Sequence, residues 1–114
     1  MNYNFKDHKK GDTFEGVTFE IKVNGSALDL TGASLKMELR ALEKTGAIAA
    51  TFTDSSSGGL TITDESNGIF KFDKQVIDIT AQTYYYDIQI TLASGDVKSY
   101  IEGTWNIVQD ITQG

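Results

Sequence analysis

The side chains that could act as a nucleophile, a general base or a metal ligand are few, because the chain has one histidine and no cysteine. His8 lies in a polar N-terminal segment, where nothing in the sequence would hold its ring within hydrogen-bond reach of a nucleophile, as Ser-His-Asp catalysis requires. The usual zinc sites need a cluster of cysteine and histidine ligands, which this composition excludes. We therefore interpret His8 as a solvated surface residue and expect neither enzyme activity nor a cofactor.

Oxygen ligands gather in the segment from Asp64 to Gly68, and oxygen is the ligand that calcium prefers. The segment is short, and it lacks the spaced acids and the late bidentate glutamate of a calcium-binding loop. Its Asn67-Gly68 pair is also the commonest signal for a tight hairpin turn. We favour a plain turn here and keep calcium binding as the minor alternative.

Three acidic side chains, Glu38, Asp87 and Glu102, fall on the polar faces of segments that alternate as strands. The paired carboxylates of a glycosidase can come from different strands, so spacing along the chain does not exclude such a pair. A catalytic acid, however, usually lies in an apolar cleft that raises its pKa. Basic residues are interleaved with these acids, namely Lys36, Arg40 and Lys98. We expect a solvated polar face rather than a catalytic pair.

The tyrosine run from Tyr84 to Tyr86 is the most suggestive feature of the sequence. Alternation directs Tyr84 and Tyr86 inward and Tyr85 outward, near Tyr100 if the last two strands pair. Exposed tyrosines are favoured at protein interfaces and as platforms for sugars. A cross-strand aromatic pair that only stabilises the sheet is the simpler interpretation. The candidate interface residues are Tyr3, Phe5, Tyr85 and Tyr100.

The elements that must position these side chains are strands, because hydrophobic residues recur mainly with a period of two. The predicted strands lie within residues 17–23, 34–41, 47–53, 60–63, 69–72, 84–92 and 97–108. A helix from Leu35 to Lys44 is the alternative for the second of these, since its residues favour helices. Residues 73–83 have no clear period and are typical of a loop, with one helical turn near residues 76–81 as an option. Trp105 shares a face with Ile101 and Ile107, so we expect it in the core.

Several short strands separated by turns predict an all-β fold of about seven to eight strands, a two-sheet sandwich in preference to a barrel. The 114 residues have room for one domain. We expect a flexible N-terminal arm over residues 1–9 and a single sandwich domain over residues 10–114. Such a polar arm could become ordered against an adjacent subunit.

The charge balance is acidic, with 16 Asp and Glu residues against 10 Lys and Arg residues and a net charge of −6. Nucleic-acid-binding proteins gain affinity by neutralising phosphates with basic residues, so nucleic acid is not an expected partner. No segment approaches the roughly 20 apolar residues that cross a bilayer, and the N-terminus shows no secretion signal. With the absence of cysteine, this favours folding in a reducing cytosol and no membrane partner.

Between about residues 9 and 108 the chain carries a pattern of segments in a characteristic order. The segments are Lys10 to Phe14, Leu28 to Ala33, Leu35 to Arg40, Gly59 to Ile62, Asn67 to Phe70, Tyr86 to Ile90 and Ile101 to Ile107. Together they resemble small immunoglobulin-like β-sandwich proteins of tailed bacteriophages and prophages, including the N-terminal domains of baseplate upper proteins. The tyrosine run and the absence of proline depart from the family without touching these segments.

The resemblance implies an immunoglobulin-like β-sandwich and a non-enzymatic structural role in the virion, as a tail, baseplate, collar or neck component. The expected partners are other virion proteins, met in multiple copies, and no catalytic residues carry over. The protein would be made in the bacterial cytoplasm and located in the virion. The alternative is a carbohydrate-binding or host-adhesion module in which Tyr85 and Tyr100 would stack on a host glycan.

Overall fold

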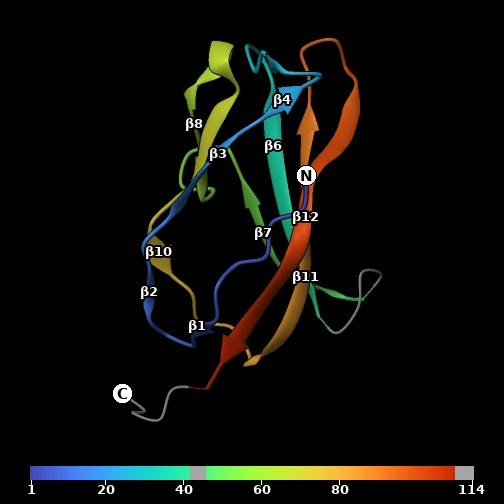
Figure 1. Cartoon of the computed structure of the whole chain (residues 1–114). Helices are drawn as coiled ribbons and strands as arrows, with labels where there is room; N and C mark the ends of the chain where they lie inside the picture. The colour runs from blue at the N-terminus through green and yellow to red at the C-terminus, as the bar shows by residue number, and fades with distance from the viewer. Residues whose placement is uncertain (42–45, 110–114) are drawn as a thin grey trace.

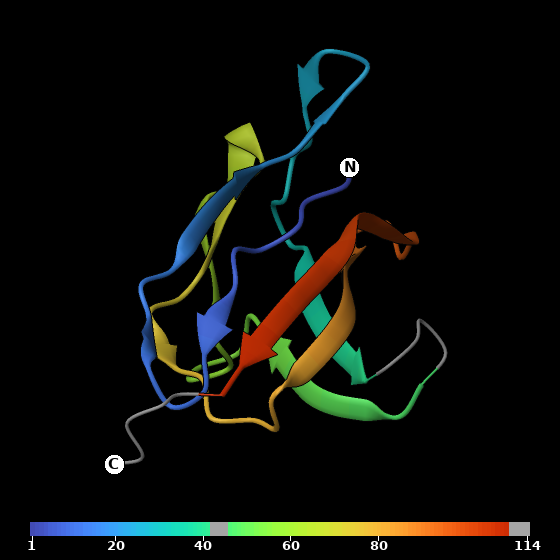
Figure 2. The same cartoon turned by 60° about the horizontal axis from the view of Figure 1, so that its bottom comes forward.

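The computed structural model describes residues 1–41 and 46–109, and its strands pack in two layers (Figure 1). The strands are β1 (His8–Lys9), β2 (Thr13–Phe14), β3 (Val17–Glu20), β4 (Lys22–Val23), β5 (Ser26–Ala27), β6 (Ser34–Ala41), β7 (Ile48–Thr53), β8 (Leu60–Asp64), β9 (Ile69–Phe72), β10 (Gln75–Val76), β11 (Gln82–Thr91) and β12 (Val97–Val108). One layer is a five-stranded sheet in the order β1-β12-β11-β6-β7. The other contains the three-stranded sheet β3-β9-β8 and the two-stranded pair β10-β2, and the β4-β5 hairpin projects at one end of the domain (Figure 2).

The all-β sandwich predicted from the two-residue period is confirmed. Seven strands of the described chain are four or more residues long, which agrees with the expected number. The helical content of the described residues is the short 3-10 turn η1 (Glu65–Asn67). Within these residues, no helix has the length and apolar character needed to span a membrane.

Residues 34–41 form strand β6, so the predicted strand is confirmed and the alternative helix is wrong for the described part of this segment. Leu35, Met37 and Leu39 are buried, and the residues between them face outward. This is the period of a strand with one face on the core, and it overrides the helix propensity of the side chains. Strand β6 pairs antiparallel with β11, which in turn pairs antiparallel with β12, so the expected hairpin lies at the centre of the sheet.

Trp105 is fully buried, as predicted, and forms the centre of an aromatic cluster. Its ring lies 4.6 Å from that of Phe5, 5.2 Å from that of Phe14 and 5.8 Å from that of Phe72, measured between centroids. Within the described part of the chain, its Nε1 atom has no hydrogen-bond partner. Packing therefore holds the indole in place.

The segment between β9 and β11 contains no helical turn in the structure, so that option is wrong. Residues Gln75–Val76 form β10, which pairs antiparallel with β2 at the end of the second layer. Ile77 follows and is buried in the core. A short bridge of two residues leaves too little alternation for the sequence to reveal a strand.

The N-terminal segment differs most from its prediction, because it lies along the edge of the domain (Figure 2). The Tyr3 and Phe5 amides donate to the carbonyl oxygens of Glu102 and Thr104, at 2.9 and 3.0 Å, and the Glu102 amide donates to the Met1 carbonyl at 3.0 Å. Strand β1 then continues the parallel pairing with β12. The expected flexible arm over residues 1–9 is therefore wrong.

The reason lies in a short alternation at the N-terminus. Tyr3 and Phe5 turn toward the core, where Phe5 is only 7% exposed, while Asn2 and Asn4 turn toward the outer face. Two inward aromatic rings bury enough apolar area to order a short segment.

Candidate functional site

Three carboxylates meet on the outer face of the five-stranded sheet. In the strand register, Asp87 of β11 lies directly opposite Glu38 of β6 on one side and Glu102 of β12 on the other. Like charges directly opposite one another destabilise a sheet. The sequence placed these acids on polar faces but not next to each other, and only the pairing of the strands aligns them.

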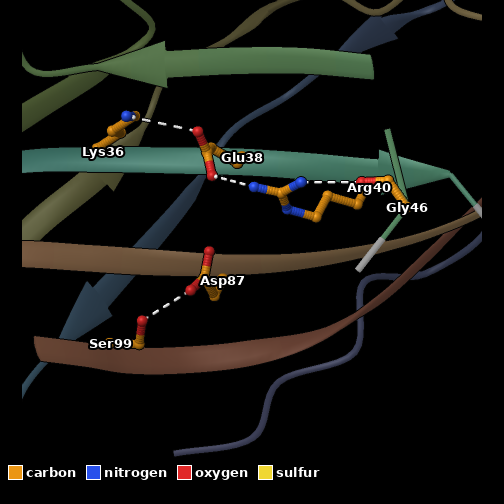
Figure 3. A network of polar contacts seen from close by, with 6 residues as sticks. All are labelled: Lys36, Glu38, Arg40, Gly46, Asp87 and Ser99. Atoms are coloured by element: carbon orange, nitrogen blue, oxygen red, sulfur yellow. Dashed lines mark hydrogen bonds and ion pairs between the residues drawn. The ribbon is translucent and has the colours of Figure 1, made fainter. Parts of the chain in front are cut away.

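Basic and hydroxyl groups offset part of this repulsion (Figure 3). Glu38 lies between Lys36, whose Nζ is 3.4 Å from Oε2, and Arg40, whose Nη2 is 3.1 Å from Oε1. Arg40 also donates from Nη1 to the Gly46 carbonyl at 2.8 Å. Because the Glu38 side chain is only 18% exposed, the expectation of a solvated face is wrong at this position.

The other two acids are less fully paired. Asp87 accepts a hydrogen bond from the Ser99 hydroxyl at 2.7 Å. No side chain in the described residues forms a hydrogen bond or an ion pair with the Glu102 carboxylate. Negative charge therefore remains available at the β12 end of the row.

These acids line a hollow of about 330 Å³. Its lining consists of Asn2, Asn4, Glu38, Arg40, Tyr85, Tyr86, Asp87, Glu102, Gly103 and Thr104. The N-terminal segment forms one wall, held by Asn4 Oδ1, which accepts from the Thr104 amide at 3.0 Å and the Thr104 hydroxyl at 3.2 Å. The charged lining has three acids and one base, so it favours a positively charged group.

Tyr85 lies at this hollow, but the predicted pairing with Tyr100 is wrong. Tyr85 lies opposite Thr104 on β12 and Arg40 on β6. A register shift after Ile88 leaves Tyr100 without a residue directly opposite it. The Lys98 ammonium instead lies 5.5 Å from the centroid of the Tyr100 ring. Tyr100 lies four residues from Thr104 along β12, so the two tyrosines are apart with or without this shift. The register of a hairpin cannot be read from alternation alone.

Tyr3 and Phe5 are not exposed interface residues in this structure. The Tyr3 ring packs edge-on against Phe5 and Phe19, with centroids 5.1 and 5.3 Å away. Its carbonyl accepts a hydrogen bond from the Tyr86 hydroxyl. Burial raises the pKa of Tyr86 far above its usual range, and the nearby Tyr3 adds to that rise. Phe5 therefore belongs to the core, and Tyr3 is partly buried against it.

Gly103 explains how the N-terminal segment approaches β12 so closely. A Cβ atom at this position would collide with the carbonyl group of Tyr3 and come within 2.9 Å of the Asn4 side chain. Sequence reasoning missed Asn2, Asn4, Gly103 and Thr104 as members of the site. The alternation of residues 2–5 was the available signal, although four residues are too few to carry it alone.

The two other candidates for chemistry serve local structure. His8 Nε2 donates to the Asp12 carbonyl at 2.9 Å, at the turn that follows β1. The Asp64 carboxylate accepts from Asn67 at 2.9 Å and from Ser66 at 3.4 Å, as expected for a turn. The part of the chain that the structure describes has no group of three or more side chains suited to a metal ion.

Comparison with known proteins supports the fold. No protein-family model matches the chain, and no curated protein matches it. Among solved structures, the chain is similar to the crystal structure of CopC from Methylosinus trichosporium OB3b, with a TM-score of 0.50 and 8% sequence identity. The match covers 95% of this chain and 89% of that chain. At this identity the likeness shows the all-β sandwich fold and nothing about function.

Proposed function

We propose that this protein is a non-enzymatic structural component of a phage virion that docks to other virion proteins through the outer face of its five-stranded sheet. The virion role rests on the sequence resemblance from Lys10 to Ile107. The docking face rests on one observation, the hollow beside Tyr85, where acidic groups outnumber basic ones.

The lining suits an anchor side chain from a neighbouring protein. Tyrosine and arginine carry much of the binding energy at protein interfaces, and Tyr85 and Arg40 lie opposite each other here. Asp87 and Glu102 add negative charge beside them. A lysine or arginine side chain of the neighbour would satisfy the unpaired Glu102 carboxylate and pack on the Tyr85 ring.

The test is incorporation of the protein into purified phage particles, measured by mass spectrometry. We expect the protein in the particles, and we expect the Tyr85→Ala/Glu102→Gln double variant to be incorporated less than wild type. Glu20→Gln is the matched control, because Glu20 is an exposed acid in the opposite layer. Absence of the protein from particles would overturn the virion role, and normal incorporation of the double variant would overturn the docking face.

A carbohydrate-binding or host-adhesion role is the second candidate, and the same hollow favours it. Its amides and carboxylates, from Asn2, Asn4 and Asp87, are groups that hydrogen-bond sugar hydroxyls, and the Tyr85 ring could stack on a sugar. A glycan array with bacterial cell-wall saccharides tests this role. Binding that Tyr85→Ala abolishes and Tyr100→Ala retains would favour it, whereas no binding by a protein found in particles would favour docking.

A further inference from the structure

The β4-β5 hairpin projects from one end of the domain and carries an Asn-Gly pair at its tip (Figure 2). Asn24 and Gly25 are the two turn residues, and their φ angles of 52° and 82° are those of a tight hairpin turn. Every residue from Lys22 to Ala27 is exposed. A Cβ atom at Gly25 would have no neighbour within 4 Å, so the space around the turn is open.

The groups of this pair that could react with each other are free. Within the described residues, neither the Asn24 carboxamide nor the Gly25 amide forms a hydrogen bond. Glycine has no side chain, so nothing attached to residue 25 hinders its nitrogen. The hairpin pairs through two residues of each strand, and none of its side chains is buried. Such a hairpin opens at little cost in free energy, which lets the backbone of Asn24 leave the turn conformation.

We propose that Asn24 is a site of intramolecular deamidation. The Gly25 amide nitrogen attacks Cγ of Asn24, the bond from Cγ to Nδ2 breaks, and ammonia leaves with the proton that the amide gives up. The product is a succinimide ring, which water opens at either of its carbonyl groups to give aspartate or isoaspartate. Asparagine is one of the thermolabile residues of proteins, and the reaction needs no partner other than water. It adds one negative charge to a chain whose net charge is −6.

The second Asn-Gly pair of the chain, Asn67-Gly68, lies in a setting that opposes the same reaction. The Gly68 amide donates to the Glu65 carbonyl at 3.3 Å, and Asn67 Nδ2 donates to the Asp64 carboxylate at 2.9 Å. Gly68 is buried, and a Cβ atom there would lie 2.7 Å from two backbone carbonyl oxygens. Backbone rotation at this pair would therefore disturb the packing of the domain. We expect the fold to protect Asn67 and to leave Asn24 reactive.

Peptide mapping by mass spectrometry, after incubation of the folded protein in mildly alkaline buffer, tests the proposal. We expect aspartate and isoaspartate to accumulate at least about tenfold faster at Asn24 than at Asn67, because local opening at Asn67 costs more free energy. In denaturant the two rates should become similar, since the fold no longer protects Asn67. No reaction at Asn24 in the folded protein, or equal rates at the two sites, would overturn the proposal. An unchanged advantage of Asn24 in denaturant would overturn the protection of Asn67 by the fold.

Two variants assign the new charge to one residue. Isoelectric focusing of incubated wild type should show an acidic species that Asn24→Gly does not form, because glycine has no carboxamide and also fits a tight hairpin turn. Asn67→Ser is the matched control and should form the acidic species at the wild-type rate. Formation of that species by Asn24→Gly at the wild-type rate would overturn the assignment. The β4-β5 hairpin shares no residue with the hollow, so failure here leaves the docking face unaffected.

Discussion

The two sides of the five-stranded sheet differ in what lies against them. Beside β12, the chain's own N-terminus adds the edge strand β1 and buries Phe5 against Trp105. At the β7 edge, an uncharged strand has no neighbouring strand in the described residues, and its outer side is engaged by Gly58 and Gly59 at Thr53. Gly103 admits the backbone of Tyr3 at the first edge, and the second has no comparable contact. The difference teaches that side chains outside the sheet decide whether an edge is available to other molecules.

The largest expected effect follows from removing the anchor of the closed edge. Phe5→Ala should lower the free energy of unfolding by about 3–5 kcal/mol, because it leaves a cavity beside Trp105. Ile48→Ala at the open edge should cost less than about 1 kcal/mol, because that side chain is half exposed. Denaturant titration of both variants measures the difference. If Phe5→Ala lowered the free energy of unfolding as little as Ile48→Ala is expected to, the N-terminal segment would not stabilise the domain.

Gly103→Ala should displace the N-terminal segment without touching its own side chains. The added methyl group collides with the Tyr3 carbonyl, and we expect a loss of about 1–3 kcal/mol. Hydrogen exchange should show the Tyr3 and Phe5 amides losing protection while the Ile88 amide keeps it. Unchanged protection of Tyr3 and Phe5 would mean that the N-terminal segment does not need the close contact between Gly103 and the Tyr3 backbone.

Tyr86→Phe should have a smaller effect, which depends on pH. Loss of the hydrogen bond to the Tyr3 carbonyl should cost about 0.5–1.5 kcal/mol near neutral pH. Burial raises the pKa of Tyr86 above its ordinary value of 10.0, so its contribution is complete below that pH and declines as the pH rises beyond it. Denaturant titrations between pH 8 and 11 (roughly the interval around the tyrosine pKa) should show a steeper alkaline decline for wild type than for Tyr86→Phe. Equal declines in the two proteins would contradict this role of the Tyr86 hydroxyl.

The smallest effect is expected at the open edge itself. Thr51→Val should change the stability of the monomer by no more than about 0.5 kcal/mol, because Thr51 is exposed and unpaired on its outer side. In dilute wild-type protein the Thr51 amide should exchange much faster than the Phe5 amide. Slow exchange of Thr51 in dilute protein would remove the contrast between the edges.

Local alternation was enough to predict the strands and the direction of many side chains. The inward positions of Trp105, Tyr84 and Tyr86 follow from a period of two, and so does the strand at Leu35 to Leu39. This period is a property of neighbouring residues, because successive side chains of a strand point to opposite faces. The all-β sandwich is therefore readable from the amino-acid sequence.

Pairing and register were out of reach of the same reasoning. The row of Glu38, Asp87 and Glu102 exists because β6, which is distant in sequence, joins the β11–β12 hairpin in one register, and the register of that hairpin sets Tyr85 opposite Thr104 and away from Tyr100. The N-terminal segment docks because its two aromatic rings find a core made by residues far along the chain. Such outcomes depend on long-range contacts, whose free energy is set by the assembled domain and not by any segment alone.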